Sequence, residues 1–367
     1  MSMRTTPPFR SDEVGSLLRP AALKEARAKY ARGEIGAGAL KEVEDREIAA
    51  VIKQQEAIGL KAVTDGEFRR AWWHFDFYGA LSGVELREVD SGIQFQGVQT
   101  KAQAPHIVGQ LGFPGTHPMV EHFRFLKAHA NATAKMTIPS PSVLYFRVAS
   151  VDKKLYPDRE ALFAGLAETY RQAIRAFYDA GCRYLQFDDT AWAYLCSKDE
   201  MDKAKQRGTD VNGLAQAYAR TINEALAAKP DDMTITTHIC RGNFRSTWIT
   251  SGGYEPVAEV LFGATNYDGY FLEYDSDRAG GFEPLRFVPK GKKQIVLGLI
   301  TTKTGALEKK DDIKRRIAEA EKYVALDQQC LSPQCGFAST EEGNILGHDE
   351  QWAKLRLAVE IARDVWA

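Results

Sequence analysis

The sequence predicts a single-domain α/β protein: a (β/α)8 TIM barrel with a β-hairpin inserted after the second strand. Short apolar segments alternate with longer helical patterns along the chain, which is typical of βα units around a parallel sheet. The candidate strands number about eight, the count of a closed barrel. A doubly wound open sheet is the alternative, but no G-x-G-x-x-G turn follows the first strand.

The candidate strands and helices can be placed in order. The strands are EVGS (13–16), KAVTDGEF (61–68), TAKMTIPSP (133–141), CRYLQFDD (182–189), MTITTHIC (233–240), GYFLEYD (269–275), QIVLGLIT (294–301) and the region CLSPQCG (330–336). Helical patterns precede most of them, at 40–59, 158–181, 211–229, 254–264, 284–293 and 311–325. Two of these patterns end in glycine, at Gly59 and Gly181, as expected for a left-handed helix C-cap.

One region departs from this alternation of strands and helices. Between 83 and 112, apolar and polar residues alternate around Gly92 and Gly97, which predicts an antiparallel hairpin. No linker or low-complexity tract divides the chain, so we expect one catalytic domain over 1–367.

Charge and composition narrow the class of partner. Lys plus Arg number 48 and Asp plus Glu 49 in 367 residues, so no net positive charge attracts nucleic acid or anionic lipid. No apolar run approaches the roughly 20 residues of a transmembrane helix, and the N-terminus lacks a signal-peptide pattern. We therefore expect a cytoplasmic protein with a small-molecule substrate. Its five widely spaced cysteines argue against a disulfide framework.

The fifth candidate strand ends with His238 and Cys240, two metal-binding residue types. Residues i and i+2 of a strand point to the same face, so both side chains can reach one point. Alone, the pair is weak evidence for a metal, because a core cysteine beside a hydrogen-bonded histidine gives the same pattern. However, Glu273 ends the next strand and Cys335 lies in the turn after the last, and the strand ends of a parallel barrel converge at one mouth. One nitrogen, one oxygen and two sulfur ligands suit tetrahedral Zn²⁺.

These motifs resemble the C-terminal catalytic half of cobalamin-independent methionine synthase, which binds zinc through H-x-C, a later Glu and a Cys in a C-G turn. Here the matching segments are THIC, LEYD and PQCGF, and the likeness runs from EVGS to QCGF. The resemblance implies a (β/α)8 barrel, a zinc ion and methyl transfer to the thiol of homocysteine. A thiol bound to zinc is deprotonated and therefore nucleophilic at neutral pH.

The resemblance also implies four substrate-binding residues. Gly15 and Ser16 in the turn of EVGSLLRP correspond to the segment that holds the homocysteine carboxylate, and Glu67 of TDGEFRR to the carboxylate that binds the ammonium group. Asp188 of LQFDDTAW corresponds to a second such carboxylate, facing the ammonium rather than the metal. The alternatives are a helix cap for Ser16 and ordinary ion pairs for the two acids.

The likeness fails on the methyl-donor side. In the family, a D-I-H-S-P motif carries the proton-donating histidine, but the corresponding segment here is GLITTKTG. Lys303 in this segment is a candidate general acid or anion-binding group, or else a solvated loop residue. Similarly, the segment IPSPSVLYF stands at the position of the pterin-binding P-V-T…W segment of the family and lacks that pattern. The aromatic run AWWHFDFYG (71–79) is either a pocket wall or core, and His74 is interpreted as structural.

The sequence thus predicts a zinc-dependent S-methyltransferase that converts homocysteine to methionine, with a methylfolate or methylcorrinoid donor. A corrinoid protein is a possible delivering partner. The alternatives are alkylation of another thiol, an epoxide as the electrophile, a metal-free barrel resembling uroporphyrinogen decarboxylase, and a non-catalytic barrel with a structural zinc.

Overall fold

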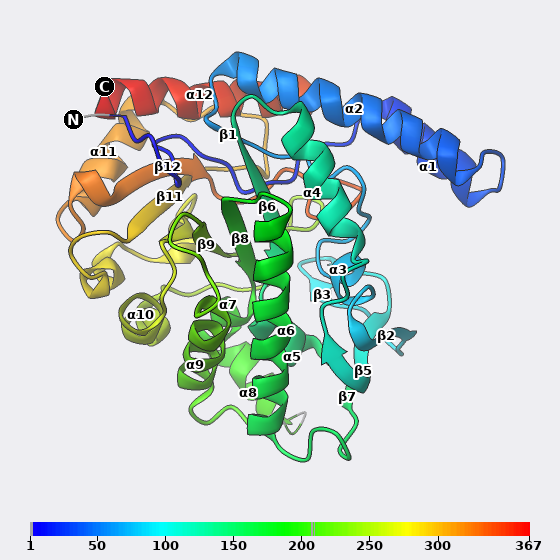
Figure 1. The fold of residues 1–367 in the computed structure, drawn as a ribbon. Helices are drawn as coiled ribbons and strands as arrows, with labels where there is room; N and C mark the ends of the chain where they lie inside the picture. The colour runs from blue at the N-terminus through cyan, green and yellow to red at the C-terminus, as the bar shows by residue number, and fades with distance from the viewer. Residues whose placement is uncertain (1–2, 207, 209) are drawn as a thin grey trace.

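The centre of the molecule is a curled sheet of seven parallel strands (Figure 1). The computed structural model describes residues 3–206, 208 and 210–367. In spatial order the strands are β1 (Ala62–Val63), β6 (Thr133–Pro139), β8 (Tyr184–Asp189), β9 (Thr234–Ile239), β10 (Gly269–Glu273), β11 (Gln294–Ile300) and β12 (Gln329–Pro333). Every neighbouring pair is parallel. This is the α/β fold of TIM-barrel type that the alternation predicts.

The predicted first strand, EVGS, is not a strand of this sheet. The chain just before it makes one parallel bridge, between Ser11 and Leu331 of β12, with the Asp12 N–H donating to the Leu331 carbonyl at 3.0 Å. On the side that faces β1, a side-chain hydrogen bond stands in place of a strand ladder: the Thr64 hydroxyl donates to the Gly15 carbonyl at 2.6 Å. The N-terminal segment therefore occupies the eighth position without regular pairing to β1.

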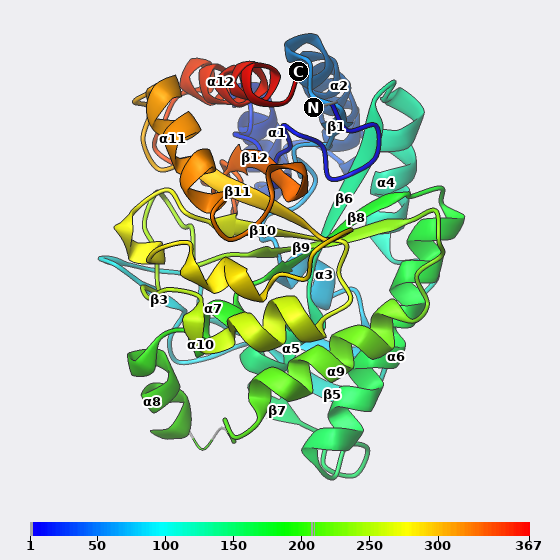
Figure 2. The same cartoon turned by 90° about the vertical axis from the view of Figure 1, so that its left-hand side faces the viewer.

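Long helices surround the sheet (Figures 1 and 2). They are α1 (Ala21–Ala31), α2 (Ala37–Ile58), α4 (Pro118–His129), α6 (Arg159–Asp179), α9 (Leu214–Leu226), α10 (Glu255–Ala258) with η1 (Glu259–Ala264), α11 (Lys310–Ala320) and α12 (His348–Trp366). Gly59 ends α2 with φ of 98°, the left-handed conformation that the sequence predicts there. The two chain termini lie side by side next to α12 and α2.

Shorter elements complete the described part of the chain. They are the helices α3 (Phe75–Tyr78), α5 (Pro141–Arg147), α7 (Ala191–Leu195) and α8 (Lys198–Gln206), and the 3-10 turns η2 (Asp277–Ala279), η3 (Glu283–Phe287) and η4 (Leu326–Gln328). α3, α5 and α7 follow β1, β6 and β8 respectively, so their first residues lie near the carboxyl ends of these strands.

The segment between β1 and β6 contains antiparallel strands. β2 (Ser82–Glu88) pairs with β5 (Gln103–Gly112), and the small hairpin of β3 (Gln94–Phe95) and β4 (Val98–Gln99) lies between them in the sequence. β7 (Ser150–Val151) adds to β5 in parallel. The Gln96 N–H donates to the carbonyl of Trp248 at 3.2 Å, which ties the hairpin to the loop after β9.

The strands of the parallel sheet are almost wholly buried, and β10, β11 and β12 have no exposed position. An ion pair of Lys135 with Asp12, 3.1 Å apart and fully buried, lies inside the sheet. Burial raises the pKa of the neighbouring Glu13 to about 8. Within the described ranges no helix is both long and apolar enough to span a membrane, and all five cysteines are unpaired and buried.

Candidate metal centre and substrate pocket

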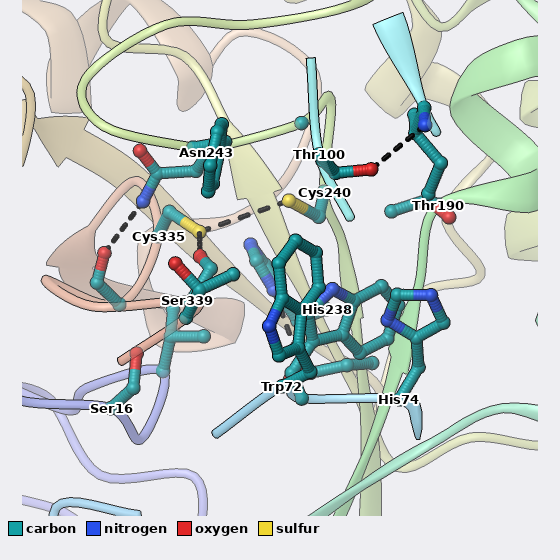
Figure 3. A pocket seen from close by; sticks show the side chains of 18 of the residues that line it. Ser16, Trp72, His74, Thr100, Thr190, His238, Cys240, Asn243, Cys335 and Ser339 are labelled. Carbon is teal, nitrogen blue, oxygen red and sulfur yellow. Dashed lines mark hydrogen bonds and ion pairs between the residues drawn. The ribbon is translucent and has the colours of Figure 1, made fainter. Parts of the chain in front are cut away.

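Four potential metal ligands converge at the carboxyl ends of the last strands, and three of them, His238, Cys240 and Cys335, are labelled in Figure 3. His238 is in β9 and Cys240 follows it, Glu273 is the last residue of β10, and Cys335 lies in the turn after β12. One ligand atom from each residue lies within 4.8 Å of all the others, and all four side chains are buried. The two sulfur atoms are 3.8 Å apart. The fold thus brings together the four residues that the sequence predicted as ligands.

Backbone hydrogen bonds fix the ends of β9 and β10. The Cys240 N–H donates to the Asp189 carbonyl at 2.8 Å, which extends the pairing of β8 and β9 by one residue. The Arg241 N–H donates to Glu273 Oε1 at 2.7 Å and so turns this carboxylate toward the two cysteines. His238 and Cys240 are two residues apart along the same extended segment, so their side chains point to the same face and both reach the cluster.

The donor set and one carboxylate oxygen that accepts no hydrogen bond fit a metal cation. Glu273 is 0% exposed, yet its Oε2 makes no hydrogen bond within the described part of the chain, and its charged neighbour there is Lys303 Nζ at 3.8 Å. A buried carboxylate oxygen without a hydrogen bond is costly, and a metal cation in direct contact would satisfy it. Two thiols, an imidazole and a carboxylate are the ligands that tetrahedral Zn²⁺ takes in proteins.

Hydrogen bonds and charges within the metal-free cluster shift the pKa values of its members. Burial lowers the pKa of His238, but the hydrogen bond to Asp188 and the charges of Cys335 and Glu273 outweigh burial and raise this pKa to about 9. The hydrogen bond between the two thiols raises the pKa of Cys240 and lowers that of Cys335, so Cys335 ionises first. The free site therefore holds an imidazolium close to negative groups, and a metal would displace these protons.

Asp188 contacts His238, one of the four candidate metal ligands, directly. Its Oδ1 lies 3.4 Å from His238 Nδ1 and accepts a hydrogen bond from Gln186 Nε2 at 2.7 Å. The carbonyl of Gln334 lies 3.1 Å from His238 Nε2. A carboxylate beside a ligand histidine orients the ring and makes it more basic. This contact differs from the expectation that Asp188 faces only the substrate ammonium.

The predicted substrate residues and the cluster share one narrow pocket. Ser16, Glu67 and Asp188 line it together with His238, Cys240 and Cys335. Glu67 adopts a positive φ of 59°, an unusual backbone for a non-glycine residue that is typical of functional turns.

Close packing holds this part of the pocket wall in place. Glu67 Oε1 accepts a hydrogen bond from the Thr137 hydroxyl at 2.8 Å, and Oε2 pairs with Arg70. Gly15 lies behind the wall, where an added Cβ would come 2.5 Å from Glu67 Oε1. An added Cβ on Gly336 would lie 2.0 Å from the Ser16 hydroxyl oxygen. A side chain at position 15 or 336 would therefore clash with the pocket wall, so both positions require glycine.

Lys303 lies behind the cluster rather than in the pocket wall that the described residues form. It is 7% exposed, and its Nζ is 3.2 Å from Asp275 Oδ2 and 3.8 Å from Glu273 Oε2. The interpretation of Lys303 as a solvated loop lysine is therefore wrong. Its position suits charge compensation of Glu273, and its proposed catalytic role stays a prediction.

The structure adds pocket residues to the predicted substrate-binding set, and part of the aromatic run 71–79 forms pocket wall, one of the two interpretations of that run. His74, which was interpreted as structural, lines the pocket with Trp72 and Trp73 of the same aromatic run. Arg147, the last residue of α5, and Thr190, which precedes α7, complete this side. The position of these residues just after strands β1, β6 and β8 was the available signal, because loops at strand carboxyl ends form the barrel mouth.

These features define an α/β barrel-type protein whose mouth holds a buried N/O/S ligand cluster that opens on a pocket. Residues 9–364 match the family model "Cobalamin-independent synthase, Catalytic domain". The uncharacterized protein YxjG of Bacillus subtilis is 54% identical over 99% of this chain and 96% of its own length. A Listeria monocytogenes crystal structure assigned as a vitamin-B12-independent methionine synthase is 44% identical, covers 99% of this chain and 100% of its own, and has a TM-score of 0.81.

A more distant relative is the 5-methyltetrahydropteroyltriglutamate–homocysteine methyltransferase of Synechococcus, which is 24% identical over 90% of this chain and 40% of its own length. The chain therefore belongs to the cobalamin-independent methionine synthase family, a family of methyltransferases, and corresponds to its catalytic domain.

Proposed function

We propose that the protein is a zinc-dependent methyltransferase that methylates the thiol of homocysteine to give methionine. The observation that carries the proposal is the buried set of His238, Cys240, Glu273 and Cys335, in which one carboxylate oxygen accepts no hydrogen bond and three members line a pocket. Zinc bound there would lower the pKa of a thiol that joins it and keep that thiol as the thiolate. Family membership supports the same reaction.

The residues around the cluster suit an amino-acid thiol. Glu67 and Asp188 both line the pocket, where their carboxylates could accept hydrogen bonds from an α-ammonium group. The Ser16 hydroxyl accepts a hydrogen bond from the Ala338 N–H at 3.3 Å, so its own proton can be donated to a substrate carboxylate. In this arrangement the amino-acid end of homocysteine is bound by side chains, and its sulfur points to Cys240 and Cys335.

The transfer itself breaks one bond and forms one. The sulfur of homocysteine attacks the methyl carbon, a C–S bond forms, and the bond between the methyl group and the donor breaks. The electron pair of that bond leaves with the donor, and the proton lost by the thiol goes to the donor or to solvent. Folates, methylcorrinoids and corrinoid proteins all meet this requirement as donors.

The test measures zinc per chain and methionine formation from homocysteine, above the uncatalysed rate, with methyltetrahydrofolate, methylcobalamin or methyl iodide as the donor. Cys335→Ser is expected to lower zinc content and abolish transfer with every donor, because a neutral hydroxyl replaces a soft thiolate ligand. Cys182→Ser is the matched control, since Cys182 is a buried cysteine in the core outside the cluster. Full zinc content and undiminished transfer in Cys335→Ser would refute the proposal.

Alkylation of another thiol, or an epoxide as electrophile, would show as zinc-dependent activity without methionine formation. A protein purified without zinc and indifferent to chelators would favour the decarboxylase-like alternative.

A further inference from the structure

A buried arginine holds the backbone of Glu67. The φ of 59° at Glu67 lies in the left-handed region, which is strained for a glutamate and persists only where surrounding contacts fix it. Arg19 is 1% exposed, and its Nη2 donates to the Glu67 carbonyl at 2.8 Å and to the Arg70 carbonyl at 3.2 Å. Arg19 Nη1 donates to the Ala338 carbonyl at 2.8 Å, in the turn after β12. The backbone around Glu67 is therefore fixed before any substrate binds.

A second buried arginine holds the carboxylate of Glu67. Arg70 is 5% exposed and lines the pocket, and its Nε and Nη2 contact Glu67 Oε2. Within the described part of the chain, Oε1 accepts one hydrogen bond, from the Thr137 hydroxyl. Each oxygen of an ionised carboxylate has two lone-pair sites, so the free acceptor capacity lies on Oε1. Arg70 thus determines which oxygen of Glu67 is left for a ligand.

The turn that carries Cys335 is anchored without Arg70. The Ala338 N–H donates to the Ser16 hydroxyl at 3.3 Å, and the Ala338 carbonyl accepts from the other buried arginine at 2.8 Å. Arg70 Nη1 adds a bond to the Ser339 carbonyl at 2.7 Å, and the Ser339 hydroxyl oxygen lies 3.9 Å from the Cys335 sulfur (Figure 3). Loss of the Arg70 guanidinium should therefore disturb the substrate-binding carboxylate more than the metal ligands.

Two buried guanidinium groups at such close quarters cost free energy. Burial and the charge of Arg70 lower the pKa of Arg19 to about 9. Both groups are directed at a single residue, since one binds the carbonyl of Glu67 and the other its carboxylate. Local costs of this kind are concentrated at functional sites, where they hold a group in one geometry.

We propose that Arg70 is a positioning residue for recognition of an α-amino acid. It acts through Glu67, because it holds Oε2, leaves Oε1 for the α-ammonium group and so orients the amino-acid end of the substrate. A thiol without an amino-acid end has no group that uses this arrangement, so Arg70 contributes to selectivity for amino-acid thiols. The inference rests on the proposed function, since it concerns the methyl acceptor of the same site.

A double-mutant cycle tests whether Arg70 acts through Glu67. L-Methionine is titrated by calorimetry into zinc-free wild type, Arg70→Met, Glu67→Gln and the double variant. Arg70→Met removes the charge and the donors, and it should weaken binding about ten- to hundredfold. Arg70→Lys, which restores the charge, should recover part of the loss. In the double variant, binding should be little weaker than in Glu67→Gln alone, because the residue through which Arg70 acts is already changed.

Arg10→Met is the matched control for loss of a buried arginine. Arg10 is 4% exposed, lies outside the pocket lining and donates to the Asp327 carbonyl at 3.1 Å. Its replacement should lower the thermal unfolding temperature, as replacement of Arg70 should, but leave the methionine affinity at the wild-type value. On zinc-loaded protein, Arg70→Met should lower the ratio of homocysteine affinity to 2-mercaptoethanol affinity about tenfold or more, because only homocysteine has an ammonium group.

Three results would overturn the assignment: methionine affinity unchanged in Arg70→Met, additive losses in the double variant, or equal losses of affinity for homocysteine and 2-mercaptoethanol. The last two would mean that Arg70 only supports the fold. The proposed function can fail separately. If the wild type lacks zinc or does not methylate homocysteine while methionine binding depends on Arg70 through Glu67, the proposed function is wrong and the positioning role of Arg70 stands.

Discussion

Replacement of Asp188 by asparagine tests the contact between the pocket and the metal cluster. The carboxylate oxygen lies 3.4 Å from His238 Nδ1. At that separation, and at an effective dielectric constant of about 20, a carboxylate and an imidazolium attract by roughly 5 kcal/mol. Burial of the ring opposes this attraction, and the pKa of about 9 against the ordinary 6.5 corresponds to a net effect of about 3 kcal/mol. Asp188→Asn keeps the shape and removes this charge.

Two affinities should fall in Asp188→Asn. Zinc affinity, measured by chelator competition at about pH 9.5, where His238 is mostly neutral, should fall about 10- to 100-fold, because the ring loses its orienting carboxylate. Homocysteine affinity, measured by calorimetry on zinc-loaded protein, should fall by about 2 to 5 kcal/mol, because the ammonium group loses one of two carboxylates. Glu67→Gln is the control and should weaken homocysteine binding alone. Wild-type values for both affinities in Asp188→Asn would refute this account.

Four further predictions concern the same region. Glu273→Gln should retain more zinc than a cysteine variant, since three ligands remain, yet lower the transfer rate; zinc content and rate are measured together. Lys303→Met should lower the unfolding free energy of the metal-free protein by about 3 kcal/mol, because Asp275 and Glu273 lose a buried ion-pair partner, and zinc should restore part of it in thermal unfolding. Gly336→Ala should cost about 1 to 3 kcal/mol in denaturant unfolding and weaken homocysteine binding, because the new Cβ would lie 2.0 Å from the Ser16 hydroxyl oxygen. The raised pKa of His238 makes its stabilisation of the metal-free protein complete below about pH 6.5 and lost as pH rises through about 9, which a pH series of unfolding measurements checks.

The convergence of the four candidate ligands could be predicted from the sequence because it depends on two local rules. The period of two in a strand places His238 and Cys240 on one face, and parallel strands end at one mouth, where Glu273 and Cys335 also lie. The fold class followed from the alternation of strands and helices, which is equally local. Zinc itself stays a prediction.

The other features of the fold and the pocket depend on tertiary contacts, which a local sequence pattern does not predict. EVGS was expected to be the first strand, but side-chain hydrogen bonds such as that from Thr64 replace a strand ladder there. Lys303 has the sequence context of a loop, and only its approach to Asp275 and Glu273 buries it. His74 and Arg147 are separated by about seventy residues in the sequence, so their common pocket appears only when β1 and β6 pair.

X-ray absorption at the zinc edge, with and without homocysteine, tests the central claim most directly. Zinc-loaded protein alone should show two sulfur ligands, from Cys240 and Cys335, together with nitrogen and oxygen from His238 and Glu273. Addition of homocysteine should raise the sulfur count to three, because its thiol joins the metal. An unchanged ligand set at saturating homocysteine would contradict the account, and the zinc would then have only a structural role.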